Sequence, residues 1–277
     1  MRPRTAGSAR ATVLAVTSGK GGVGKTNVTI NVAIAMARLG LRVGVLDADF
    51  GLGNIDVLLG LAPGAHVGHV VAGEKRLHDI VVRGPQGISI IPASSGLQSM
   101  TALTPTQRGR LLEALDLACA DLDFLLIDTA SGIADNVMDM LKLAERIVLV
   151  TSLEPTAIVD AYALTKVLTM ADPGKEIGVV VNGAPSADDA TLAYKQLETA
   201  TRRFLSRSVS FYGYISDDPA VRESVLVQRA IVDHLPHAPA SRCYRIIASR
   251  LAGLGPAKGG LRLAPTFASD NEVTQCA

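Results

Sequence analysis

A glycine-rich segment that contains two lysines lies near the start of the chain, at Gly19-Lys20-Gly21-Gly22-Val23-Gly24-Lys25-Thr26. An apolar run, Val13 to Val16, precedes it, and apolar residues at helical spacing follow it. The spacing is GxxxxGK[ST], in which glycines let backbone N–H groups turn toward an anion at a helix N-terminus. We therefore predict a phosphate-binding loop, in which Lys25, the lysine of the pattern, reaches the β- and γ-phosphates and the Thr26 hydroxyl ligates Mg²⁺. The predicted nucleotide-binding residues are Gly19, Gly21, Gly22, Val23, Gly24, Lys25, Thr26 and Asn27.

Three carboxylates follow apolar segments farther along the chain. Leu41 to Leu46 is predicted to be a short buried strand that leads into Asp47-Ala48-Asp49, and a second apolar segment ends in Asp128. Ligands of open α/β sheets collect at the carboxyl ends of parallel strands. We expect Asp47 to bind the hydration shell of Mg²⁺ and Asp128 to hold Mg²⁺ through water. We expect Asp49 to orient the attacking water or accept its proton; the alternative is that Asp47 and Asp49 cap a helix that starts near Asn54.

Lys20 is the second lysine of the loop, and it cannot easily reach the phosphates that Lys25 contacts without crowding it. We expect Lys20 to point outward, toward a nucleotide held by a neighbouring subunit. The predicted catalytic residues are therefore Lys20, Lys25 and Asp49, and the alternative for Lys20 is a solvated loop lysine.

Two further segments have residue types that suit a nucleotide. Thr129 to Gly132 follows the strand that ends in Asp128, and its glycine permits the backbone to approach a γ-phosphate and to move when that phosphate leaves. Asn182 ends the apolar run Val179 to Val181, and its amide offers both a donor and an acceptor to the edge of adenine. The alternative for Asn182 is a turn residue, because it precedes a glycine.

These residues need a scaffold, and the remaining sequence alternates between strand and helix patterns. The predicted strands and helices are Ile88–Ile91, Pro105–Ala118, Arg146–Thr151, Ala157–Leu168, Ile177–Val181, Ala190–Leu205, Val209–Ile215 and Ser241–Leu251. Residues 62–86 are rich in loop residues and stay unassigned. This alternation predicts an α/β fold with a mainly parallel twisted sheet and helices on both faces. We expect a single domain over residues 12–255, with flexible segments at 1–11 and 256–277.

Composition limits the other possibilities. The chain has 277 residues, 48% of them hydrophobic, which is enough for a large core, and its net charge of +1 gives no overall attraction to nucleic acid or anionic membrane. Arg202, Arg203 and Arg207 cluster where a helix is predicted to end, which ordinary dipole effects favour, so direct DNA binding is not expected. The three cysteines form no CxxC pair, and no apolar run approaches the roughly 18 residues of a membrane span. We expect a cytoplasmic protein.

The loop sequence KGGVGKT resembles the deviant Walker A motif of the MinD/ParA group of P-loop ATPases. In that group, the lysine that Lys20 matches crosses an ATP-sandwiched dimer. The resemblance implies ATP and Mg²⁺ as cofactors and an ATP-dependent homodimer. It also implies an adenine-reading role for Asn182 and a base-lining loop that includes Asp217 and Pro219.

Five segments narrow the resemblance: GKGGVGKTNVTINVA, DADFGLGNIDVLLGL, PASSGLQSM, IDTASGIADNV and EPTAIVDAYALTKVL. Together they resemble the FlhG/FleN regulators of flagellar number, from about Thr12 to Arg250. This resemblance implies a slow ATPase switch that restrains a σ54-type flagellar transcription activator. It also implies a link to the FlhF-type GTPase and a place at the cell pole through partners. Many members stimulate that GTPase through a DQAxxLR motif, which residues 1–11 do not contain.

The alternative within the same chemistry is a MinD- or ParA-like ATPase that places the division site or partitions DNA or other cargo. MinD-type proteins bind membranes through a basic amphipathic helix at the C-terminus. Here the tail has Gly259 to Pro265, which makes a poor helix, so membrane binding is not expected. A redox protein like the nitrogenase iron protein requires cysteines near Thr129 to Gly132, where the sequence has none, and a small-molecule kinase requires a separate substrate pocket.

Overall fold

One mainly parallel sheet organises the chain in the computed structural model, which describes residues 11–93 and 104–253. The strands are β1 (Thr12–Thr17), β2 (Val43–Ala48), β3 (Val82–Arg83), β4 (Ser89–Ile91), β5 (Phe124–Thr129), β6 (Arg146–Thr151), β7 (Glu176–Ala184) and β8 (Ser210–Ser216). Their order across the sheet is β3-β4-β2-β5-β1-β6-β7-β8. All neighbouring strands are parallel except β3 and β4, which pair antiparallel. The predicted α/β fold class is confirmed.

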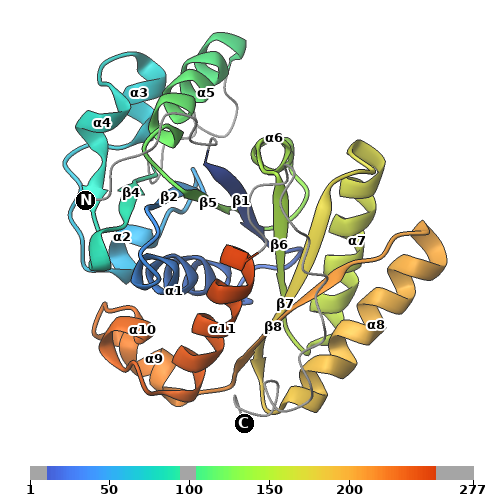
Figure 1. Cartoon of the computed structure of the whole chain (residues 1–277). Helices are drawn as coiled ribbons and strands as arrows, with labels where there is room; N and C mark the ends of the chain where they lie inside the picture. Colours follow the sequence, from blue (N-terminus) through green and yellow to red (C-terminus); the bar gives the residue numbers. More distant parts are fainter. Residues whose placement is uncertain (1–10, 94–103, 254–277) are drawn as a thin grey trace.

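Helices cover both faces of this sheet (Figure 1). They are α1 (Lys25–Arg38), α2 (Ile55–Leu58), α3 (Val67–Ala72), α4 (Leu77–Ile80), η1 (Pro85–Gly87), α5 (Pro105–Cys119), α6 (Asp135–Leu143), α7 (Pro155–Ala171), α8 (Ala187–Leu205), α9 (Pro219–Leu226), α10 (Ile231–His234) and α11 (Pro239–Gly253). Helices α1 and α11 pack together, as do α7 and α8. The connection through α1 runs from β1 toward β2, and those through α7 and α8 run the opposite way across the sheet, so right-handed crossovers place α1 on one face and α7 and α8 on the other. Helix α11 follows the last strand and packs against α1.

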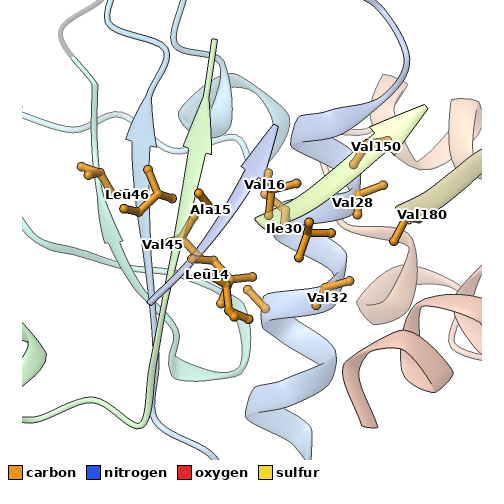
Figure 2. Close-up of a cluster of buried hydrophobic side chains, with 14 of the residues drawn as sticks. Leu14, Ala15, Val16, Val28, Ile30, Val32, Val45, Leu46, Val150 and Val180 are labelled. Carbon is orange, nitrogen blue, oxygen red and sulfur yellow. The ribbon is translucent and has the colours of Figure 1, made fainter. Parts of the chain in front are cut away.

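The centre of the sheet is β1, which lies between β5 and β6 and is buried along most of its length. Figure 2 shows Leu14, Ala15 and Val16 of β1 in one cluster with Val45 of β2 and Ile30 of α1. Each of these side chains is at most 2% exposed. Full burial of such an aliphatic side chain contributes about 1.5–3 kcal/mol. This packing fixes the carboxyl end of β1, where the glycine-rich loop begins.

Several segments differ from the sequence-based expectation. Strand β7 runs to Ala184 rather than Val181, so Asn182 lies within it. Strand β2 begins at Val43 rather than Leu41 and continues to Ala48, so Asp47 lies within the strand, where it pairs opposite Asp128. The unassigned residues 62–86 contain α3, α4, β3 and the start of η1. Helix α6 (Asp135–Leu143) was not predicted, although it has a buried apolar side that includes Val137, Met138 and Leu141.

Some predictions lie outside the described residues: the N-terminal segment up to residue 10, most of the PASSGLQSM segment, and the tail from residue 254. Among the residues that the structure describes, no helix has the length and apolar character needed to cross a membrane.

Candidate functional site

Most of the predicted site residues lie at the carboxyl edge of the central strands. In the sheet register, Asp128 of β5 pairs with Val16 of β1 on one side and with Asp47 of β2 on the other. The glycine-rich loop follows β1 directly and leads into α1. The loop and the two carboxylates therefore share one end of the sheet, as the sequence predicted.

The loop has a backbone that favours glycine at several positions. Gly22 and Gly24 have φ of +81° and +87°, which side chains rarely permit. A Cβ at Gly19 would lie 2.3 Å from the backbone carbonyl of Asp160, so the loop packs directly on the backbone of α7. Gly24 is the N-cap of the 14-residue α1 and offers no capping side chain. The first N–H groups of α1 therefore form an anion site, with half-buried Thr26 and Asn27 in its first turn.

Lys25, Asp128 and Thr29 form a buried polar cluster under the loop. The Lys25 ammonium lies 3.1 Å from Asp128 Oδ1, and these side chains are 9% and 1% exposed. The Thr29 hydroxyl donates to the same Asp128 oxygen at 2.8 Å. Sequence reasoning missed Thr29, because a buried threonine on a helix usually bonds only to the helix backbone.

Asp47 is the second buried carboxylate, 2% exposed. Its Oδ1 accepts the N–H of Asp49 and its Oδ2 accepts the N–H of Ile55, both at 3.2 Å. Burial, and then the nearby charge of Asp128, raise the pKa of Asp47 to about 7. Asp49 is half-buried, and its Oδ1 accepts the N–H of Leu52 at 3.1 Å. The carboxylate of Asp47 is thus held in an orientation at an energetic cost that a nearby cation would offset.

Lys20 contacts residues of its own chain. Its ammonium forms an ion pair with Glu154 and donates to the Thr156 hydroxyl at 3.0 Å. Both partners belong to the EPTAIVDAYAL segment, at the start of α7, for which the sequence suggested no chemistry. The sequence feature that could have indicated a role for this segment is its position shortly after a buried strand, β6. The predicted role of Lys20 in a neighbouring subunit requires that this contact break.

Asn182 lies next to the loop, where its side-chain N–H donates to the Val23 carbonyl at 2.8 Å. Asp217 and Pro219 lie at the end of β8 and are exposed, and the Asp217 N–H donates to the Ala184 carbonyl at 2.9 Å. All of them lie at the carboxyl edge of the sheet, but Asp217 and Pro219 lie one strand beyond Asn182.

Asp218, which sequence reasoning passed over, holds this edge together. Its two oxygens accept the N–H groups of Ala220 and Ala240, both at 3.0 Å, so it joins the start of α9 to the start of α11.

The segment after β5 also contacts the loop. The Gly132 N–H donates to the Ser18 carbonyl at 2.9 Å, and the φ of Gly132 is +93°. The Thr129 hydroxyl has two carbonyl acceptors within reach, that of Ala130 at 2.8 Å and that of Val16 at 3.2 Å. The segment after β5 is thus joined to the start of the loop by a hydrogen bond, and its role as a switch stays a prediction.

The donor set fits a magnesium-bound nucleoside triphosphate. Backbone N–H groups at the start of α1 and the ammonium of Lys25 provide positive charge for phosphates. The hydroxyl of Thr26 and the carboxylates of Asp47 and Asp128 are oxygen ligands of the kind that Mg²⁺ prefers, directly or through water. This arrangement can bind, orient and neutralise a phosphate chain.

The arginine cluster at the end of α8 has partners within the chain. Arg202 pairs with Glu198 at 2.7 Å, and Arg203 lies over the ring of Phe204, 5.3 Å from its centre. The Arg207 guanidinium donates to the Pro173 carbonyl.

Comparison with known proteins agrees with a nucleotide site of the P-loop type. A family model named ParA, described as NUBPL iron-transfer P-loop NTPase, matches residues 10–252. The antiactivator FleN of Pseudomonas aeruginosa is 43% identical over 239 residues, 86% of this chain and 85% of FleN. The flagellum site-determining protein YlxH of Helicobacter pylori is 30% identical over 213 residues, 76% of this chain and 72% of YlxH. The crystal structure of the cell division ATPase MinD of Pyrococcus furiosus superposes with a TM-score of 0.75 at 26% identity, covering 88% of this chain and 100% of that one.

Proposed function

The chain belongs to the ParA family of P-loop NTPases, in the group that includes the antiactivator FleN, and we propose that it regulates flagellar number as an ATP-dependent switch. In this proposal, the ATP-bound form restrains a flagellar transcription activator, and ATP hydrolysis ends the restraint. The 43% identity to FleN over 86% of the chain is the observation that carries the proposal. The site supports it, because a phosphate loop and two buried carboxylates meet at one edge of the sheet.

ATP hydrolysis at this site depends on positioning. Lys25 leaves Asp128 to contact the β- and γ-phosphates, while the N–H groups at the start of α1 hold the phosphate chain. Thr26 would ligate Mg²⁺, and Asp47 and Asp128 would hold it through water; the ion would neutralise charge on the phosphates. Asp49 orients the attacking water or accepts its proton, and Asn182 binds the adenine edge, with Asp217 and Pro219 lining the base.

The switch is a homodimer formed with ATP. Lys20 leaves Glu154 and Thr156 and reaches the nucleotide of the partner subunit. Because the lysine of one subunit completes the site of the other, hydrolysis and dimerisation are linked, and a slow reaction acts as the timer of the dimer. The partners in this proposal are a σ54-type flagellar activator and an FlhF-type GTPase, through which the protein reaches the cell pole.

A pull-down with the Asp49→Ala variant tests the proposal. In ATP, this variant is expected to stay dimeric and to retain a transcription activator. In ADP it should become monomeric and release the activator. The Asp188→Ala variant is the matched control, because Asp188 lies exposed on α8. Recovery of DNA alone would favour a ParA-like role and overturn the proposed one. A Lys20→Ala chain that dimerises normally with ATP would refute the dimer mechanism.

A further inference from the structure

Thr29 lies one turn after Lys25 on α1 and is fully buried. Its hydroxyl has two acceptors within reach, Asp128 Oδ1 at 2.8 Å and the Lys25 carbonyl at 3.1 Å. A hydroxyl has one proton to donate, and a bond to a charged carboxylate is stronger and shorter than a bond to a carbonyl. The Thr29 hydroxyl therefore donates to Asp128, and the Lys25 carbonyl is the weaker of the two acceptors.

Lys25 and Thr29 both contact the same oxygen of Asp128. Nucleotide binding moves one of these side chains and not the other. Lys25 must leave Asp128 to reach the phosphates. Thr29 has a short β-branched side chain on a helix whose neighbouring residues, Val28 and Ile30, are at most 2% exposed, so it cannot follow.

Asp128 needs a hydrogen-bond donor that remains in place when Lys25 moves to the phosphates. It is 1% exposed and lies opposite Asp47 in the sheet register, so two buried carboxylates share the site. A buried carboxylate without a hydrogen-bond partner is costly and turns easily to another orientation. When Lys25 departs, the Thr29 hydroxyl is the side-chain donor still on Oδ1 among the described contacts.

We propose that Thr29 is a positioning residue for Asp128: its hydroxyl holds Oδ1, so that the other carboxylate oxygen faces the hydration shell of Mg²⁺. This inference rests on the proposed Mg–nucleotide site. Residues that orient a metal ligand in this way typically affect metal affinity by about 10- to 100-fold.

The Thr29→Val variant removes the hydroxyl with almost no change of shape. Mg²⁺ is titrated against the binding of fluorescent ADP, and binding in EDTA is measured separately. We expect the Mg²⁺ concentration at half-maximal effect to rise about 10- to 100-fold, with the EDTA affinity unchanged. Thr29→Ser, which keeps the hydroxyl, should restore the wild-type Mg²⁺ requirement.

Thr165→Val is the matched control. Thr165 is also fully buried on a helix, but its hydroxyl donates to the Ala161 carbonyl at 2.8 Å rather than to a carboxylate. This variant should keep the wild-type Mg²⁺ requirement. If Thr29→Val does not fold by circular dichroism, Thr29→Cys makes the same comparison, because a thiol is a weaker donor of similar size.

Two results would overturn the inference: an unchanged Mg²⁺ requirement in the folded Thr29 variant, or an equal rise in Thr29→Ser and Thr29→Val. Either result leaves the proposed function standing. Failure of the wild-type chain to bind nucleotide in a Mg²⁺-dependent way would instead refute the proposed site itself.

Discussion

Removing the Glu154 carboxylate should strengthen the ATP-dependent dimer. Glu154 forms an ion pair with Lys20 in its own chain, and the proposed dimer needs this lysine in the partner's site. The Glu154→Gln substitution keeps the size of the side chain and removes its charge. Less free energy is then needed to release Lys20, although the Thr156 hydroxyl still accepts from it.

The solvent exposure of the Lys20–Glu154 pair determines how much the dimer Kd should change. The two side chains are 37% and 64% exposed, and ion pairs of this kind contribute about 0.2–1 kcal/mol. Each dimer breaks two such pairs, so the gain is roughly 0.4–2 kcal/mol, which corresponds to a dimer Kd lowered by about 2- to 30-fold.

Sedimentation velocity in ATP measures this Kd in an Asp49→Ala background, where hydrolysis does not consume the dimer. Glu198→Gln is the control, because it removes another ion pair, with Arg202 on α8, away from the loop. In a Lys20→Ala background, Glu154→Gln should no longer lower the dimer Kd. A Kd that is unchanged or higher in Glu154→Gln would refute the idea that Glu154 competes with the dimer for Lys20.

Two further predictions concern the loop and the buried carboxylates. Gly19→Ala places a methyl group 2.3 Å from the Asp160 carbonyl, so the loop must move at a cost of roughly 1–3 kcal/mol, and we expect nucleotide affinity to fall by about 5- to 150-fold. Gly64→Ala, whose Cβ would meet nothing within 4 Å, should bind normally, and equal loss in both would contradict the packing argument. Burial raises the pKa of Asp47 from its ordinary value of 3.8 to about 7, so the folded state binds more protons than the unfolded state, and the free energy of unfolding falls as pH rises through this window. In EDTA without nucleotide, the wild type should lose roughly 2–3 kcal/mol relative to Asp47→Asn between about pH 5 and pH 8, measured by urea unfolding with circular dichroism; a pH-independent difference would contradict it.

The sequence predicted the parts of the site that depend on local spacing. The order of glycines and Lys25 specifies a phosphate loop, and apolar runs before Asp47 and Asp128 specify strands that end at one edge of the sheet. The contact of Lys20 with Glu154 joins residues 134 positions apart, and no local pattern encodes such a distance. The short helices within residues 62–86 also escaped prediction, because four to six residues are too few to show a helical period.

Both lysines of the loop are paired with carboxylates in this structure, and the two pairs differ in burial. The Lys25–Asp128 pair is 9% and 1% exposed, whereas the Lys20–Glu154 pair is largely open to solvent. Breaking a buried pair by taking one partner away costs about 3–5 kcal/mol, because the other charge stays unpaired. A cation that takes the place of Lys25 at Asp128 would offset this cost, which favours Mg–ATP over free ATP. Glu154 is exposed and water can solvate it, so Lys20 can leave without such a replacement. The burial of the two pairs thus predicts that Mg²⁺ assists the movement of Lys25 to the nucleotide, whereas the release of Lys20 needs no added cation.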